Sequence, residues 1–419
     1  MNYLQSLKFL DSFLNLEKLS QLPENPFFNL KRMEHLLEAG GHPEKKFFPI
    51  LIAGTTGKGS TGFFLESILK ANGIRTGYYH SPHVEDPRER IRLQGAMASR
   101  DLWAEGLSEL RTLLRKNPVP RKYGFLTYFE AMTFLAILFF SKRGVQTGIF
   151  EIGLGGRLDA TNVLKARLVL LTPIHLDHEA FLGNTVRKIA GEKAAIIKSG
   201  NHVVTGKQFP EALRVIRAAV RKKRGHLWTA AAVSGIPLGL SGDFQKRNAG
   251  MAVKAASILG KYFDFAVNKT CTRDGLRCRA WKGRMESFRR KARTFLLDGA
   301  HNPLSTRQLV RELERRPDMK DAWLVFGAMQ DKNSREMLKV LSRFFSKAVL
   351  TRVENPRAKT LGMLLEEAKG LFKEVVPVQN IREAVSFLEK ATDPGAPAAV
   401  TGSFYLVGEA RKILKRSVT

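Results

Sequence analysis

A glycine-rich stretch, LIAGTTGKGST (51–61), has the residue types that bind phosphate groups. It departs from the common phosphate loop G-x-x-x-x-G-K-[ST], because Ile52 replaces the first glycine and Gly59 the Ser or Thr. An apolar strand pattern precedes it and a helical pattern follows, which makes a glycine turn with an unrelated lysine the weaker interpretation. Backbone N–H groups at such a helix start attract anions. We therefore expect Lys58 to contact the β- and γ-phosphates of a nucleotide and Ser60 to offer its hydroxyl to Mg²⁺.

Two further stretches place metal-binding side chains after predicted strands. Glu151 ends the strand in GIFEIGLGGRLDATN (148–162), and His178 follows the next strand. The alternatives are a solvated glutamate at an ordinary turn and a structural histidine. Because the carboxyl ends of parallel strands meet at one sheet edge, we expect Glu151 and His178 to share a metal ion. We interpret His175, three residues earlier, as structural.

Other candidate ligands lie near strand ends. Ser81 and His83 follow the short strand expected at 74–79 and could face the phosphate loop. Asp298 ends a later strand, where an acid commonly binds a ribose hydroxyl. Asn248 and Arg284 are further candidates, although each is a weak signal alone.

The order of elements predicts an α/β fold. Strand patterns alternate with helical patterns, which is typical of βαβ units and a mostly parallel sheet. The expected strands are 48–53, 147–152, 167–172 and 202–205, followed after a break by 294–298, 322–327, 347–351, 374–378 and 398–401. We therefore predict a P-loop-type ATPase domain at 1–287 and a smaller Rossmann-like domain at 288–419.

The composition limits the class of protein. The chain has 419 residues, enough for two domains, since single cores stop growing near ~250–300 residues. The formal net charge of +30 attracts anions such as nucleotides, polycarboxylates or nucleic acid. The basic segments 214–225 and 279–293 lack the interleaved aromatic residues of a single-strand nucleic-acid site. We favour a solvated basic surface over nucleic-acid binding.

No membrane or export segment is evident in the sequence. The longest apolar run, 131–140, is well short of the roughly 20 residues of a membrane span and predicts a buried helix. The amphipathic residues 1–19 lack the regions of a signal peptide. Cys271 and Cys278 form neither a zinc pattern nor a disulfide framework. We expect a cytoplasmic protein without a membrane partner.

Together, the motifs resemble the folylpolyglutamate synthase and dihydrofolate synthase family of the Mur ligase superfamily. The resemblance runs from residue 27 to residue 414. Its stretches are GTTGKGS, SPH with ERIR, TYFEAMT, EIGLGGRLDATNV, LDHEAFLGNT with GEKAAIIK, LDGAHNP, VFGAMQDK and TGSFYLVGE. The short GTTGKGS loop is similar to the phosphate loop of this superfamily.

The resemblance implies a role for each matching residue. The ATP phosphates would bind to Thr55, Thr56, Gly57, Lys58, Gly59 and Ser60, and the adenosine part to Asn248, Arg284 and Asp298 with His301 nearby. The ligands of Mg²⁺ would be Ser60, Ser81, Glu151, His178 and Lys193, the last carbamylated by CO₂. The pterin pocket would be lined by Thr127, Tyr128, Phe129, Glu130, Leu158, Asp159 and Ala160. The catalytic residues would be Lys58, His178 and Lys193.

The resemblance implies an ATP-dependent ligase that joins L-glutamate to dihydropteroate or reduced folates through an acyl phosphate. The Leu-Asp-Ala triplet at 158–160 looks like the version in bacterial enzymes that use both substrates. A monofunctional folylpolyglutamate synthase and another Mur-type amino-acid ligase remain alternatives. A GTPase or motor is disfavoured, because the guanine-reading N-K-x-D pattern is absent from the sequence. We expect a monomer.

Overall fold

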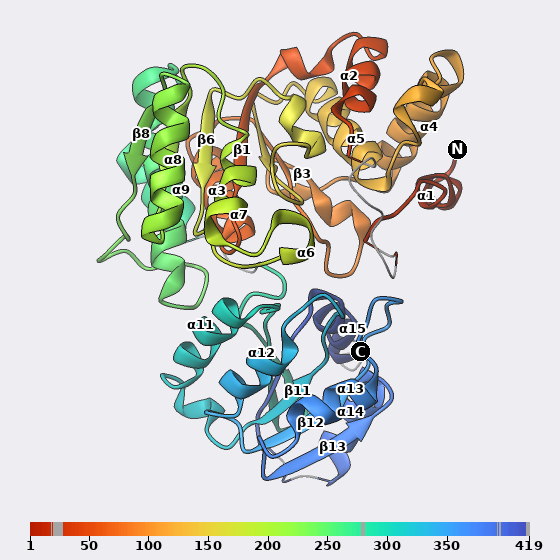
Figure 1. Cartoon of the computed structure of the whole chain (residues 1–419), viewed down its shortest axis with the longest axis vertical. Helices are drawn as coiled ribbons and strands as arrows, with labels where there is room; N and C mark the ends of the chain where they lie inside the picture. The colour runs from red at the N-terminus through yellow and green to blue at the C-terminus, as the bar shows by residue number, and fades with distance from the viewer. Residues whose placement is uncertain (18, 20–27, 278–280, 392, 394, 416–419) are drawn as a thin grey trace. The chain divides into compact units, whose positions relative to one another are not determined.

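A computed structural model of the chain describes residues 1–17, 19, 28–277, 281–391, 393 and 395–415 (Figure 1). The chain divides into two compact units. Unit 1 comprises Met1–Ser81, Arg88–Gly239 and Gln245–Cys278, and unit 2 comprises Pro82–Pro87, Leu240–Phe244 and Arg279–Thr419. Each unit is a mostly parallel sheet with helices, which confirms the predicted α/β class.

Unit 1 is built on one sheet. Within the described residues it has eight strands in the order β4-β3-β2-β5-β1-β6-β7-β8. Strand β3 pairs antiparallel with both β2 and β4. The strands are β1 (Phe48–Ala53), β2 (Thr76–Tyr79), β3 (Ile91–Leu93), β4 (Ala96–Met97), β5 (Thr147–Glu151), β6 (Leu168–Leu171), β7 (His202–Thr205) and β8 (His226–Thr229). The predicted strands of this part correspond to β1, β2, β5, β6 and β7.

Two helices of unit 1 precede the first strand, and the others lie between the strands or after the last one. They are α1 (Tyr3–Asp11), α2 (Leu30–Ala39), α3 (Lys58–Ala71), α4 (Arg100–Lys116), α5 (Tyr128–Lys142), α6 (Glu179–Leu182), α7 (Val186–Ala194), α8 (Pro210–Lys222), α9 (Phe244–Tyr262) and α10 (Lys269–Leu276). Short 3₁₀ turns occur at Pro43–Lys46, Pro87–Arg90, Arg121–Tyr123 and Ala160–Val163. The apolar run at 131–140 is the buried interior of α5, as predicted.

The two faces of the unit 1 sheet carry different helices. Successive side chains of a strand point to opposite faces, and Tyr78 and Tyr79 of β2 illustrate this. Tyr79 packs into a core that also contains side chains of α2, α4, α5, α7 and α8. Tyr78 meets α3 at Gly62, where an added Cβ would lie 2.5 Å from its ring. The helix that follows the phosphate loop therefore lies on the face opposite the larger core.

Unit 2 has two cores, one on each face of its sheet. Within the described residues the strand order is β13-β12-β11-β14-β10-β9, with β9 antiparallel to β10. The strands are β9 (Glu286–Arg290), β10 (Arg293–Leu297), β11 (Trp323–Phe326), β12 (Lys347–Thr351), β13 (Glu374–Val378) and β14 (Ala398–Thr401). One core contains α11 (Pro303–Leu313), α12 (Ser334–Leu341) and α13 (Leu361–Ala368), and the other α14 (Ile381–Ala391) and α15 (Phe404–Lys415). A 3₁₀ turn lies at Pro317–Met319.

The units differ from the predicted division at residues 287 and 288. That boundary falls inside β9, whose pairing with β10 attaches the preceding residues to unit 2. The segment Pro82–Pro87 also belongs to unit 2, because the Glu85 carboxylate accepts hydrogen bonds from Arg411 and Lys415. The functions assigned to the two domains stay predictions.

No helix in the described ranges is long and apolar enough to cross a membrane. Cys271 on α10 is a free thiol. Cys278 lies outside the described residues, as do residues 279 and 280 of the second basic segment and residue 27 at the start of the family resemblance.

A buried ion pair joins α2 to α5. Arg32 Nε lies 2.9 Å from both carboxylate oxygens of Glu130, and the two side chains are only 2% and 8% exposed. Thr127 donates its backbone N–H and hydroxyl to the same carboxylate. Burial raises the pKa of Glu130, and the charge of Arg32 opposes this rise. Removing the arginine would leave a desolvated carboxylate without its cation.

Replacing Arg32 by Met should lower the free energy of unfolding by about 3–5 kcal/mol, because Glu130 keeps a buried charge. Lys31→Met is the matched control, since Lys31 pairs with Glu34 at the surface, where the side chains are 61% and 51% exposed. Loss of this exposed pair should leave the free energy of unfolding essentially unchanged, because water and salt screen it. Chemical denaturation measures both. Equal losses in the two variants would contradict the importance of the buried pair.

Candidate active site

The loop GTTGKGS joins β1 to α3 and lies at the carboxyl edge of the sheet. Gly57 precedes the helix with φ of 85°, a conformation that suits glycine, and no side chain caps α3. The first-turn N–H groups of α3 are therefore not bonded by a capping side chain, as an anion site requires. Thr55 N–H donates to Pro173 O at 2.9 Å, which ties the loop to the segment after β6.

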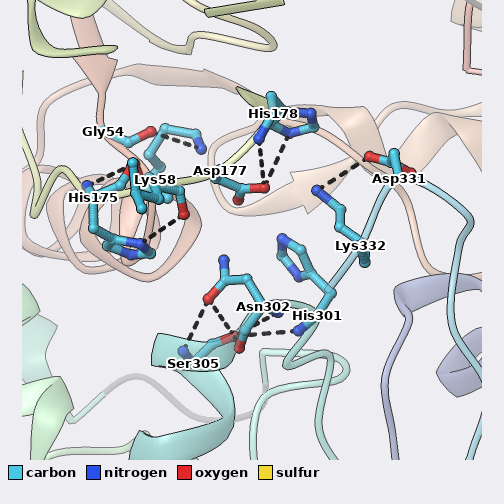
Figure 2. Close-up of polar contacts among 12 residues, drawn as sticks. Gly54, Lys58, His175, Asp177, His178, His301, Asn302, Ser305, Asp331 and Lys332 are labelled. Atoms are coloured by element: carbon cyan, nitrogen blue, oxygen red, sulfur yellow. Dashed lines mark hydrogen bonds and ion pairs between the residues drawn. The ribbon is translucent and has the colours of Figure 1, made fainter. Parts of the chain in front are cut away.

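A cation and a buried carboxylate meet beside this loop. Lys58 Nζ donates a hydrogen bond to Gly54 O at 3.2 Å (Figure 2). The same nitrogen lies 3.9 Å from Glu151 Oε1. Lys58 is the first residue of α3 and Glu151 the last of β5, and the neighbouring strands β1 and β5 run parallel. The predicted convergence of the loop with the acid at the next strand end is therefore present in unit 1.

Tyr78 supports the Glu151 carboxylate from the neighbouring strand. Its hydroxyl donates to Gly59 O at 3.0 Å and lies 3.4 Å from Glu151 Oε2. The ring is fully buried and can approach α3 only because Gly62 has no side chain. The sequence analysis missed Tyr78, because an apolar strand pattern does not show which buried tyrosine will reach the site.

Gln245 connects two predicted ligands to each other. Its Nε2 lies 3.3 Å from Ser60 Oγ, and its Oε1 accepts a hydrogen bond from Asn248 Nδ2 at 2.9 Å. An added Cβ on Gly57 would lie 2.5 Å from Asn248 Oδ1. Asn248, expected near adenosine, is thus packed against the phosphate loop. Gln245 is buried on α9, one turn before Asn248, a helical spacing that could have revealed it.

The other predicted metal ligands lie on neighbouring segments of unit 1. His178 follows β6 with φ of 52°, and its N–H donates to Asp177 Oδ1 at 3.0 Å (Figure 2). Lys193 on α7 is only 6% exposed. An added Cβ on Gly156 would lie 3.2 Å from Lys193 Cα, so the Gly-Gly loop borders this helix. Ser81 closes the first segment of unit 1, two residues beyond β2.

The side chains near the loop fit a magnesium ion. Mg²⁺ prefers oxygen ligands, keeps several waters and is usually bound through one or two carboxylates plus substrate phosphates. Glu151 supplies one buried carboxylate and Ser60 one buried hydroxyl. No group of three or more His, Cys, Asp and Glu side chains that could hold a metal occurs in the described ranges. Magnesium would therefore depend on phosphate and water oxygens as well.

The pterin-pocket residues also come together in unit 1. An added Cβ on Gly153 would lie 2.7 Å from the Phe129 ring and 3.4 Å from Asp159 Oδ2. The Phe129 ring lies 5.8 Å from that of Tyr79. Residues of α5 and of the Gly-Gly loop thus adjoin each other, and Tyr79 is a neighbour that the sequence analysis missed. Glu130 and Thr127 bond to each other as the helix cap of α5.

The Asp159 carboxylate is already fully bonded within its own loop. Oδ2 accepts from the N–H groups of Gly153 and Leu154 at 2.9 and 3.1 Å, and Oδ1 accepts from Thr161 N and Oγ1 at 3.0 and 2.6 Å. A carboxylate has about four acceptor positions. Burial raises the pKa of Asp159, and these donors oppose the rise. A pterin contact to this carboxylate would have to share or replace a loop donor.

In unit 2, the predicted nucleotide ligands surround the end of β10. Asp298 Oδ2 accepts from Met285 N at 3.0 Å, and Oδ1 accepts from Ala300 N at 3.0 Å. Burial raises the pKa of Asp298, whereas the charge of Arg284 lowers it. The Arg284 guanidinium lies 4.3 Å from the centre of the Phe404 ring. The buried Asp298 and the half-buried Arg284 therefore lie close enough to interact.

His301 begins the turn into α11. Its N–H donates to Ser305 Oγ at 3.2 Å (Figure 2). Its Nδ1 lies 2.8 Å from Gly299 O. The side chain of Lys332, in the VFGAMQDK motif, is 8% exposed, and its Nζ lies 3.4 Å from Asp331 Oδ2 (Figure 2). The motif contributes to the family resemblance, but its sequence alone gives Lys332 no role.

Comparisons with known proteins identify the class to which this fold and these motifs belong. The family described as "Mur ligase, glutamate ligase domain" matches residues 283–404. The phosphate loop of unit 1 and this domain together define a Mur-type ligase.

The particular family follows from relatives that align along most of the chain. The dihydrofolate synthase/folylpolyglutamate synthase of Bacillus subtilis (strain 168) is 33% identical over 411 residues, which cover 92% of this chain and 95% of that protein. This chain belongs to the dihydrofolate synthase/folylpolyglutamate synthase family. A Mycobacterium tuberculosis folylpolyglutamate synthase complexed with ADP has a TM-score of 0.87 at 27% identity, covering 98% of each chain. E. coli FolC in complex with DHPP and ADP has a TM-score of 0.84 at 26% identity, covering 100% of this chain and 99% of its own.

Asp159→Ala should lower the free energy of unfolding by about 1–3 kcal/mol, because it leaves buried loop donors without an acceptor. If Asp159 also binds the pterin, dihydropteroate binding should weaken further, by on the order of 2 kcal/mol. Thr161→Val is the matched control, since it removes a single donor to the carboxylate and keeps the charge. Calorimetric titration compares the two. If both variants weaken dihydropteroate binding equally, Asp159 only stabilises its own loop and does not contact the pterin.

Proposed function

We propose that this chain is an ATP-dependent ligase that joins L-glutamate to folate carboxylates. The observation that carries this proposal is the 3.9 Å approach of Lys58 and the buried Glu151 at an uncapped helix start. A free carboxylate does not react with an amine at neutral pH and must first become a better electrophile. Phosphoryl transfer from ATP gives an acyl phosphate, which the amine of L-glutamate then attacks.

The phosphate loop supplies what the first step needs. Phosphoryl transfer depends mainly on positioning and on neutralising charge on the transferred group. Loop N–H groups and Lys58 would hold the β- and γ-phosphates. Gly54 O and Glu151 orient the Lys58 ammonium, so its positive charge is held beside the phosphate loop. The adenosine contacts of Asn248, Arg284, Asp298 and His301 are part of the proposal.

The metal assignment is also part of the proposal. Glu151 and Ser60 would bind Mg²⁺ together with ATP, and Ser81, His178 and Lys193 would complete the set. When bound, Mg²⁺ neutralises charge on the phosphates. An ammonium at Lys193 would repel the ion, whereas a carbamate on its Nζ would be a carboxylate ligand. The burial of Lys193 beside the Gly-Gly loop supports a role inside the site.

The substrate range is the finer part of the proposal. The Leu-Asp-Ala triplet supports use of dihydropteroate as well as reduced folates, so we expect both dihydrofolate synthesis and polyglutamate extension. A monofunctional folylpolyglutamate synthase is the alternative. The cytoplasmic location and the monomeric state stay predictions.

Purified protein with ATP, Mg²⁺ and L-glutamate should release ADP when either dihydropteroate or tetrahydrofolate is added. If the substrate carboxylate carries heavy oxygen, one labelled atom should appear in inorganic phosphate, because the acyl phosphate breaks at the carbonyl carbon. Omission of glutamate is the control for uncoupled ATP hydrolysis. Turnover of tetrahydrofolate alone would establish the monofunctional alternative, and unlabelled phosphate would exclude the acyl phosphate.

Lys193→Ala should lose most of the ligase activity, because the variant cannot form the carbamate. A short carboxylate such as acetate, added at high concentration, should restore part of it by replacing the missing ligand. Lys188→Ala, on the same helix, is the control and should keep its activity. Steady-state ADP release measures all three proteins. Full activity of Lys193→Ala without added carboxylate would refute the carbamate.

A further inference from the structure

Hydrogen bonds hold His175 against the phosphate loop. It lies four residues beyond the end of β6 and is only 7% exposed. Its backbone N–H donates to Thr55 Oγ1 at 3.2 Å, and the same hydroxyl donates to His175 O at 3.1 Å. These two bonds hold the histidine on the loop that binds phosphate in the proposed function. Figure 2 shows His175 beside Lys58 and Gly54 of this loop.

The hydrogen bond at one ring nitrogen determines the state of the other. Nδ1 of His175 lies 3.2 Å from Leu176 O, and a carbonyl only accepts, so Nδ1 carries the hydrogen. In the neutral ring, Nε2 is then an acceptor with a lone pair. Nε2 is buried and has no hydrogen-bond partner among the described residues. A buried acceptor without a partner is costly unless a ligand or water supplies a donor.

Burial favours the neutral ring of His175. It lowers the pKa of His175 to about 4, against the opposite effects of Leu176 O and Asp177. Phosphate oxygens are acceptors and cannot satisfy Nε2. A divalent cation polarises its bound waters, whose O–H groups are strong donors, and Mg²⁺ usually keeps several of them.

We propose that Nε2 of His175 accepts a hydrogen bond from a water bound to the divalent cation that accompanies the nucleotide on the phosphate loop. His175 is thus a positioning residue for the metal–nucleotide complex. This inference rests on the proposed function, because it requires ATP and a cation at this loop. It differs from a structural role, which would need no ligand at Nε2.

The test measures binding of Mg²⁺ to the protein–ADP complex by calorimetric titration, with ADP binding in the absence of metal as a separate arm. His175→Phe and His175→Leu remove the acceptor and should weaken Mg²⁺ binding about five- to tenfold, the value of one ordinary hydrogen bond. Both should leave metal-free ADP binding within about twofold. His175→Gln, whose amide oxygen can accept at a similar distance, should recover most of the Mg²⁺ affinity.

His202→Phe is the matched control, because His202 is a buried histidine at the opposite end of the sheet, the first residue of β7. Its Nδ1 accepts from Trp228, so its partner is internal. Unchanged Mg²⁺ binding in His175→Phe and His175→Leu would overturn the inference, as would an equal loss of metal-free ADP binding. If the wild-type protein binds neither ADP nor Mg²⁺–ADP, the proposed function fails instead.

Discussion

The candidate site of unit 1 depends on one electrostatic constraint, a lysine held next to a buried carboxylate at a helix start. Lys58 and Glu151 come from different segments, and their 3.9 Å separation requires β1 and β5 to be neighbours in register. On the other side, β6 pairs with β1 and delivers Pro173 and His175 to the same loop. The strand order 5-1-6 therefore brings the anion cradle, the acid and the histidine segment to one edge.

The sequence predicts the parallel strands well because each is a short apolar run whose end carries a polar motif. The strands it misses lack that signal. Both ends of β8 are exposed, and so is β4, whereas β9 alternates between half-buried and exposed residues. None of the three therefore forms a buried apolar run that the sequence would show. The division of the chain was harder to predict, because Val84 and Glu85 attach the segment at 82–87 to unit 2 through contacts with residues more than 300 positions later.

Within the site, the sequence predicted which residues lie at the loop better than it predicted which residues contact one another. Lys58, Glu151 and Ser60 lie at the loop because strand–loop–helix order determines their place. Gln245, Tyr78 and His175 act through contacts with segments distant in the chain, and such contacts depend on packing that one sequence does not reveal. His175 is the sharpest case, since its residue type suggests a structural role and only the unpaired Nε2 points to a ligand.

The residues predicted to line a pterin pocket include two buried acids, Glu130 and Asp159. The carboxylates of Glu130 and Asp159 each receive several hydrogen bonds from their own surroundings, so both are stabilised before any substrate arrives. The bonds to Asp159 fix the backbone at Gly153 and Leu154, and Gly153 in turn adjoins the Phe129 ring. Recognition of a flat ring would then come mainly from the rigid walls, with carboxylate hydrogen bonds as a secondary contribution. Under the proposed function, recognition by shape would allow dihydropteroate and reduced folates to use a common site.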